Sequence, residues 1–243
     1  MIFGLVIPLF HQYRKKTAWR WIFASISIFL FLKATFNSNF SIKNKKPNSL
    51  VYIQNNNTKK AYWGTYNHTL DTYTKQIFKK PYQKGGIKNA ETKSKYNTRF
   101  KYHKEAIYKN ISSFIHKKTY DTIINNLRHV TISLIPKATI NKFEINNNTP
   151  IQIKSLEANH CNLHNDTLLN KGKLLVYHMA TIDKELQLSF ICNKKDSINL
   201  TINGISYDLL QHHTFDLLPR DDTMMPMPFV TNDAIITTEK VTY

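Results

Sequence analysis

Hydrophobic and polar residues alternate along much of the chain from residue 128 onward. The pattern is clear in HVTISLIP (129–136), IQIKSLEAN (151–159) and ELQLSFICN (185–193). Such alternation places the apolar side chains on one face of a strand. Further β-rich segments are TINKFEIN, KLLVYHMAT, INLTINGISYDLL and AIITTEKVTY. Short strands at this spacing, each with one apolar face, predict an antiparallel β-sandwich over residues 128–243.

The region before it, residues 49–127, has a mixed pattern. SLVYIQ (49–54) and AYWGTY (61–66) are separated by a polar turn and predict a β-hairpin. TLDTYTKQIFKK (69–80) has apolar residues at helical spacing and predicts a short amphipathic helix. Residues 81–104 are polar and rich in lysine, which predicts a long loop, and EAIYKNISSFIHK (105–117) fits a strand or a helix. The protein is therefore expected to be mainly β, with a short α/loop region.

The N-terminal part carries a long apolar run. Residues 17–36 contain WIFASISIFLFL and predict a membrane helix, since about 20 apolar residues are needed to cross a bilayer. Aromatic and basic residues at its ends are typical of anchors at the membrane interfaces. These anchor residues are Trp19, Arg20, Trp21 and Lys33.

Flanking charges predict the orientation of this helix. Residues 11–20 are basic and predict a cytoplasmic loop, because positive residues favour that side. The polar residues 37–48 then form a linker, and the β-domain is expected to be extracytoplasmic, which means periplasmic in a Gram-negative bacterium. A signal peptide is the rival interpretation, although KATFNSNF lacks a small-residue cleavage pattern.

Residues 1–10, MIFGLVIPLF, are almost wholly apolar but too short to span a bilayer alone. We expect them to be the tail of a preceding membrane helix. An interfacial N-terminal anchor is the alternative.

Composition adds a strong positive charge without a clear nucleic-acid signature. The formal net charge is +18 and the pI is about 9.8. A basic chain can bind nucleic acids or anionic membranes. The lysines, however, are spread over the whole chain and lack a recognition motif, so we expect a lipid bilayer rather than a nucleic acid as partner.

Candidate metal ligands and carboxylates are few. His160 and His164 lie four residues apart among predicted strands, and the sequence between them lacks the glutamate of a zinc-peptidase helix. His212, His213 and Asp216 are a weaker group, because neighbouring residues of a strand point to opposite faces. We therefore predict no metal ligand and no cofactor in this chain.

The two cysteines leave two readings open. Cys161 and Cys192 could form a disulfide if the domain lies outside the cytoplasm. The favoured alternative is a pair of buried thiols on neighbouring strands.

One segment, LPRDDTMMPMPFVTND (218–233), stands out because it has no lysine. Proline fixes φ and removes an N–H donor, so the segment is expected to run extended and outside a central strand. Its methionines are expected to seal one end of the sandwich, with a contact surface toward a peptidase domain or the membrane as the alternative. The arginine is expected to pair with one of the two aspartates that follow it, in a turn rather than in catalysis. The residues concerned are Arg220, Asp221, Asp222, Met224, Met225 and Met227.

Two segments resemble a known family. Residues 47–78, with LVY, KAYWGTY and LDTYTKQ, and the tail from residue 218 to 243 are similar to the C-terminal domain of membrane-anchored zinc aminopeptidases related to the endoplasmic-reticulum metallopeptidase. Members of that family carry an N-terminal zinc-peptidase domain, several membrane helices and an extracytoplasmic β-rich domain.

The resemblance implies that the catalytic part of the family lies outside this chain. Zinc belongs to the missing peptidase domain, so the resemblance assigns no zinc ligand or catalytic residue here. It implies a non-catalytic C-terminal accessory domain that works beside a separately encoded peptidase domain. The alternative is a free-standing, membrane-anchored β-sandwich that binds a protein or a glycan.

Overall fold

A computed structural model describes residues 16–87, 98–137, 140–180 and 184–243. The chain divides into two units. The smaller contains the N-terminal helix, the residues that follow it up to Lys46, and residues 222–224. The larger contains residues 47–221 and 225–243.

Helix α2 (Lys16–Asn37) confirms the helix predicted at residues 17–36. Its segment Ala18–Asn37 is long and apolar enough to cross a membrane, and its residues are exposed. The predicted helix tail at residues 1–10 lies outside the described residues. So do residues 11–15 of the predicted basic loop, whereas its residues 16–20 belong to α2.

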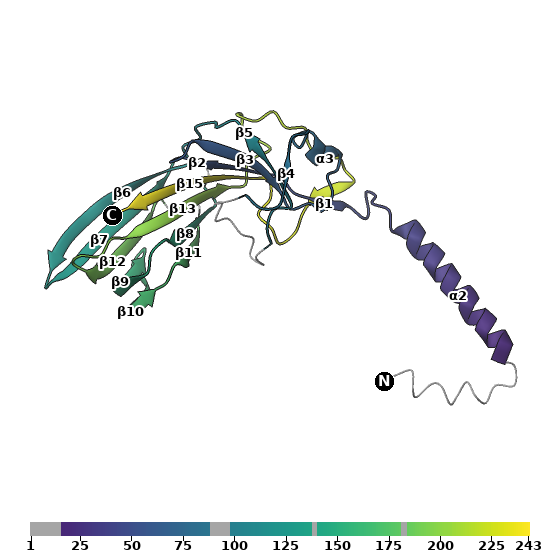
Figure 1. Cartoon of the computed structure of the whole chain (residues 1–243), viewed down its shortest axis with the longest axis horizontal. Coiled ribbons are helices and arrows are strands. Elements are labelled where there is room, and N and C mark those ends of the chain that lie inside the picture. Colours follow the sequence, from purple (N-terminus) through teal and green to yellow (C-terminus); the bar gives the residue numbers. More distant parts are fainter. Residues whose placement is uncertain (1–15, 88–97, 138–139, 181–183) are drawn as a thin grey trace. The chain divides into compact units, whose positions relative to one another are not determined.

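Two large sheets build the larger unit (Figure 1). The five-stranded sheet has the order β10-β9-β12-β7-β6. Its strands are β6 (Phe114–Ile124), β7 (Leu127–Pro136), β9 (Ile151–Ala158), β10 (Cys161–Leu169) and β12 (Leu186–Asn193). The eight-stranded sheet has the order β11-β8-β13-β15-β2-β3-β5-β4. Its strands are β2 (Val51–Asn55), β3 (Lys60–Thr65), β4 (Gln83–Lys84), β5 (Tyr102–Ala106), β8 (Lys142–Asn147), β11 (Gly172–His178), β13 (Asn199–Ser206) and β15 (Ala234–Thr242).

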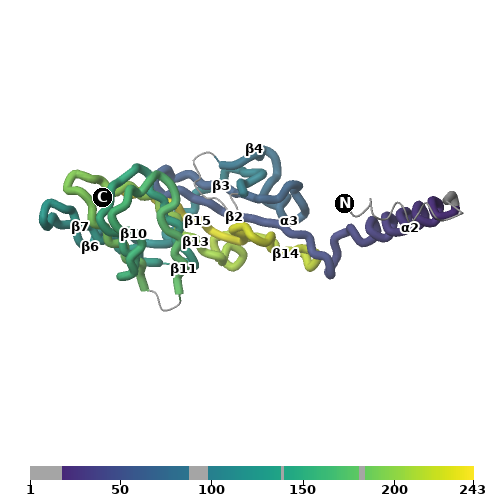
Figure 2. The backbone as a smooth tube through the Cα atoms, turned by 90° about the horizontal axis from the view of Figure 1, so that it is seen from below, coloured from purple at the N-terminus to yellow at the C-terminus, as the bar shows by residue number. Residues whose placement is uncertain are grey.

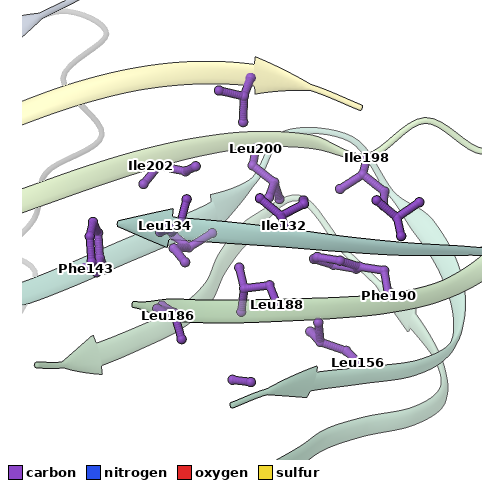
Figure 3. Packing of buried hydrophobic residues seen from close by; sticks show 14 of the residues in the cluster. Ile132, Leu134, Phe143, Leu156, Leu186, Leu188, Phe190, Ile198, Leu200 and Ile202 are labelled. Carbon is purple, nitrogen blue, oxygen red and sulfur yellow. The ribbon is translucent and has the colours of Figure 1, made fainter. Parts of the chain in front are cut away.

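The main core lies between these sheets. Along β12 the buried residues alternate with partly buried ones, as the sequence predicted. Figure 3 shows Leu188 and Phe190 pointing toward side chains of the other sheet, among them Leu200 and Ile202. Gly204 of β13 faces the same core. A Cβ at this position would come within 2.8 Å of the Phe114 ring, so the close packing requires glycine. The predicted sandwich is confirmed by this packing.

The opposite face of the eight-stranded sheet carries a second core cluster. Val51 and Ile53 of β2 and Ile236 of β15 belong to it, and Phe100 packs there from the loop before β5. Strands β2 and β15 run parallel, whereas all other ladders of the two large sheets are antiparallel. In Figure 2, β13, β15 and β2 follow one another across this sheet.

The structure corrects the predicted boundary at residue 128. Strands β2, β3 and β5 pair into the same sheet as β13 and β15, and β6 belongs to the other sheet. The hairpin of β2 and β3 is confirmed. The helix predicted over 69–80 is much shorter, because α3 covers only Thr72–Lys75, and the predicted linker ends in a strand, β1 (Lys46–Asn48).

Segment 105–117, for which strand and helix were both open, contains the end of β5 and the start of β6. Part of the predicted loop 81–104 is also strand, since β4 and most of β5 fall inside it. Strand β14 (Met224–Pro226) forms a two-stranded sheet with β1.

Candidate functional site

An aromatic cluster forms on the face of the eight-stranded sheet that carries the main core. Tyr52 pairs with Trp63 across β2 and β3, and Trp63 pairs with Lys104 of β5, so the three side chains share that face. Phe215, from the segment after β13, packs on both aromatic rings. Its centroid lies 4.7 Å from that of Tyr52 and 5.4 Å from that of Trp63. These three rings are the aromatic cluster.

The hydroxyl of Tyr52 ties the cluster to the segment after β5. It donates to the carbonyl of Ile107 at 2.9 Å and accepts from the N–H of Lys109 at 3.2 Å. Burial raises the pKa of Tyr52 to about 12, so the phenol keeps its proton for the carbonyl even at alkaline pH. Gln54, on the same face of β2, makes a second link to the segment after β5. Its side-chain amide donates to the carbonyl of Ile111 at 2.7 Å.

A cavity of about 300 Å³ opens beside the cluster. We name it the β5 pocket. Lys104 is held at its wall, since its Nζ donates to the Ile77 carbonyl at 3.0 Å. Its lining residues are Tyr52, Trp63, Gln76, Ile77, Lys104, Glu105, Ala106, Ile107, Lys109 and Phe215. An apolar wall with a few polar groups is typical of a binding site.

The edge of β5 runs along this pocket. On the side away from β3, the described strand pairing of β5 is limited to Tyr102 and His103, which pair with β4. Residues 104–106 continue past that short strand and line the pocket. An exposed strand edge next to a pocket suits an extended peptide, because main-chain bonds and a side-chain pocket act together.

A second, more open hollow of about 610 Å³ lies near α3. Lys75, Lys79, Tyr82 and Tyr102 line it together with Thr69, Leu70 and Phe78. Tyr82 and Tyr102 pack edge to face there, with their ring centroids 5.6 Å apart, but the hollow is wider and more open than the β5 pocket, so we place the candidate site at the latter.

Arg220 lies at the centre of a different, partly buried network. It donates to both carboxylate oxygens of Asp233 at 2.5 Å and to the side-chain carbonyl of Asn48. Its guanidinium carbon stands 4.7 Å from the centroid of the Tyr73 ring. We call Arg220, Asp233, Asn48 and Tyr73 the arginine clamp. The sequence placed the partner of Arg220 at Asp221 or Asp222, whereas the structure gives Arg220 a bidentate pair with Asp233.

The methionines of this segment differ in environment. Met227 is half-buried and packs against the second core cluster, whereas Met225 is exposed and Met224 is half-buried. Asp221 and Asp222 are both exposed. Of the three methionines expected to seal one end of the sandwich, Met227 packs on a core cluster, and this cluster lies on the face of the eight-stranded sheet turned away from the main core.

The anchor residues all lie in α2. Trp21 is 72% exposed, and the Trp19 ring packs on Phe23 with their centroids 5.9 Å apart. Arg20 lies one turn from the start of the helix and Lys33 one turn from its end.

The two predicted histidine groups differ in arrangement. His160 occupies a turn with φ of 64°, while His164 is exposed on β10. His212 and His213 stack on each other with ring centroids 4.8 Å apart. Within the described residues, no group of three or more His, Cys, Asp or Glu side chains could hold a metal ion.

The cysteines are both free thiols. Cys192 is buried on β12, but Cys161 is exposed on β10, so they are not two buried thiols on neighbouring strands. Strand β9 separates them, because it pairs with β10 on one side and β12 on the other.

Sequence reasoning did not identify the aromatic cluster as a site. Tyr52 and Trp63 stood in the predicted hairpin, and their spacing there already placed them across from each other. Lys104 fell in a presumed loop, and Phe215 joins them only through the tertiary fold. No protein-family model matches the chain, and no curated protein matches it. The resemblance to zinc aminopeptidases stays a prediction.

Proposed function

We propose that the chain is a membrane-anchored, non-catalytic binding domain. Helix α2 holds it in the bilayer, the sandwich lies outside the cytoplasm, and the β5 pocket takes an extended peptide segment of a partner protein. The observation that carries the proposal is the exposed, apolar stretch Ala18–Asn37, which precedes a β-sandwich with an aromatic pocket.

Membrane anchoring is tested by fractionation of cells that express the full chain. An integral protein stays with the membranes in high salt and at alkaline pH, and detergent releases it. Release by salt alone would contradict anchoring and would point to adsorption through the positive charge.

The side of the membrane is tested with the exposed thiol of Cys161. A membrane-impermeant maleimide should label it in intact cells, or in cells whose outer membrane alone has been opened. A Cys161→Ser variant is the control for labelling elsewhere. Labelling that requires disruption of the inner membrane would place the sandwich in the cytoplasm.

Peptide binding is tested with the purified full chain in detergent and immobilised ten-residue peptides that alternate apolar and polar residues. Trp63→Ala should remove binding, because it opens one wall of the pocket. Tyr120→Ala, an exposed aromatic on the five-stranded sheet, is the matched control. Equal binding by wild type and Trp63→Ala would contradict the site.

A second candidate function follows from the residues 47–78 and 218–243 that resemble zinc aminopeptidases. In this function the chain is the accessory domain of a separately encoded peptidase domain, and zinc is bound by that partner. We expect the purified chain alone not to hydrolyse aminoacyl p-nitroanilides with or without added zinc. Turnover that a chelator removes and zinc restores would contradict the accessory role.

A further inference from the structure

The segment from Leu218 to Phe229 displays large apolar side chains at the surface. Leu218 is 68% exposed, Phe229 is 73% exposed and Met225 is 36% exposed. Pro219, Pro226 and Pro228 between them are exposed as well. We call residues 218–229 the apolar loop. Large apolar side chains that gather at a surface mark an interaction site more often than scattered ones do.

The apolar loop is held in place by its own hydrogen bonds. The N–H of Leu218 donates to the side chain of Gln76 at 2.9 Å, and the N–H of Met227 donates to the carbonyl of Asn48 at 2.8 Å. Between these points, Arg220 is fixed by the arginine clamp. The exposed side chains are therefore presented from a fixed backbone, which lowers the entropy that binding must overcome.

Charge distribution singles out the same segment. The chain carries 34 lysines and arginines, yet between Lys195 and Lys240 the only one is Arg220, and this arginine is 9% exposed. The apolar loop thus lies within a longer stretch, residues 196–239, that contains no lysine. Its exposed charges are the carboxylates of Asp221 and Asp222.

Covalent connection limits how far this loop can lie from the membrane. Residues 38–45 join α2 to β1, and a chain of that length spans at most about 30 Å when fully extended. Strand β1 pairs with β14, which lies within the apolar loop. The linker itself exposes Phe40 and Ile42, so both the tether and the loop carry apolar groups.

We propose that the apolar loop lies in the interfacial layer of the bilayer into which α2 inserts, with Leu218, Met225 and Phe229 among the lipid headgroups and upper acyl chains. This proposal rests on the anchoring proposed above. The carboxylates of Asp221 and Asp222 keep the loop at headgroup depth, because charged groups are costly deeper in the hydrocarbon. The contact fixes the orientation of the sandwich on the membrane.

The test uses the full chain in phosphatidylcholine vesicles with a fluorescent, environment-sensitive label. A Cys161→Ser background leaves only the buried Cys192, and Phe229→Cys then provides the labelling site. Ile123→Cys is the matched control, since Ile123 is also an exposed apolar residue, at the end of β6. Lipids with a nitroxide near the headgroup should quench most of the fluorescence at position 229 and little at position 123, while aqueous iodide should show the reverse.

Two results would overturn the proposal. Position 229 could be as accessible to iodide as position 123, or it could be shielded from iodide and yet not quenched by the lipid nitroxide, which would show that protein covers it. A label at Ser27→Cys in α2, read with a nitroxide deep in the acyl chain, tests the anchoring separately from the loop contact. Quenching at 27 without quenching at 229 overturns the loop contact alone, whereas no quenching at 27 overturns the anchoring and the loop contact with it.

Discussion

A single guanidinium, that of Arg220, joins three distant parts of the chain. Its partners are Asn48 before β2, Tyr73 in α3 and Asp233 before β15. Arg220 is 9% exposed and Asp233 is 17% exposed, so each would leave an uncompensated buried charge if the other were removed.

We expect Arg220→Ala to destabilise the protein by about 3–5 kcal/mol, the usual cost of breaking a buried ion pair. Arg220→Lys should recover only part of this, because an ammonium cannot form the bidentate pair. Urea denaturation of the full chain in detergent measures the loss. Asp222→Ala, which removes an exposed carboxylate in the same loop, is the control and should cost about 1 kcal/mol or less. Equal losses for both variants would contradict the clamp.

The methionines give a second prediction at the scale of single residues. Met227 packs on the second core cluster, whereas Met225 is exposed. Met227→Ala should therefore lower Tm clearly. The loss in the free energy of unfolding should be smaller than the about 2–5 kcal/mol of a fully buried Met→Ala change. Met225→Ala should leave Tm close to that of the wild type. Alternation along an extended segment would place positions 225 and 227 on one face, whereas the structure gives the two side chains different exposure. A similar Tm for both variants would show that Met227 does not stabilise the second core cluster.

At the scale of elements, sequence pattern succeeded where one face of a strand is buried. Strands β9 and β12 alternate and were predicted with nearly the observed bounds. Strand β10 was missed because most of its residues are exposed, so no apolar face marks it. Strand β6 is also exposed over most of its length, so it too has no apolar face that marks it as a strand. Both are edge strands, whose hydrogen bonds rather than their side chains place them in the sheet.

Helix α2 can be tested with charges at its centre. Each aspartate near the middle of a membrane helix costs about 3 kcal/mol on insertion scales. Phe29→Asp combined with Leu30→Asp should therefore move the chain out of the membrane fraction. Phe40→Asp combined with Ile42→Asp, in the linker after the helix, is the control and should stay in the membrane fraction. A double α2 variant that still resists alkaline extraction would show that α2 is not the anchor.

The β6–β7 hairpin contains an ion pair with a defined pH response. Arg128 donates to both carboxylate oxygens of Asp121, at 2.9 and 2.8 Å. These hydrogen bonds, with a further one from Lys118, hold the pKa of Asp121 far below its usual range. Because the folded pKa is depressed, the stabilisation is full above the unfolded pKa of about 4 and is lost as the pH falls through the folded pKa.

We therefore expect part of the acid destabilisation below about pH 4 to disappear in Asp121→Asn. Urea denaturation at several pH values measures it. Asp196→Asn, at an aspartate whose main-chain carbonyl accepts from Arg128, is the control and should keep the acid response of the wild type. A pH dependence of Asp121→Asn that matches the wild type would show that the pair adds no net stability.

For the whole molecule, the sequence predicted the class of fold but not its limits. The sandwich was expected to begin at residue 128, because the clear alternation starts there. The eight-stranded sheet nevertheless places β2 and β3 beside β15, and β2 is buried on both faces. A strand covered on both faces shows no alternation, so its membership of the sandwich could not be read from its pattern. The arginine clamp was missed for a related reason, since Asp233 is close to Arg220 only in the folded chain.

A fragment that starts at residue 128 should therefore not fold alone. It would lack β2, β3, β5 and β6, and one edge of β15 would lose its partner. We expect little near-ultraviolet circular dichroism and no cooperative unfolding from residues 128–243. A fragment that spans residues 38–243 should unfold in a single transition. Cooperative unfolding of the shorter fragment would restore the predicted boundary.

The parallel pairing of β2 with β15 has a consequence for the order of events during synthesis. Asn56, just after β2, bonds to Glu239, which lies 183 residues further along the chain. A hairpin of β2 and β3 can form as soon as it emerges, but the other edge of β2 must wait for residues 234–238. If the chain crosses the membrane as it is made, that edge stays open to other strands for nearly the whole passage. Closure of the sheet is then a late event. A chaperone that binds unfolded chains on the far side of the membrane would be expected to bind the open edge of β2.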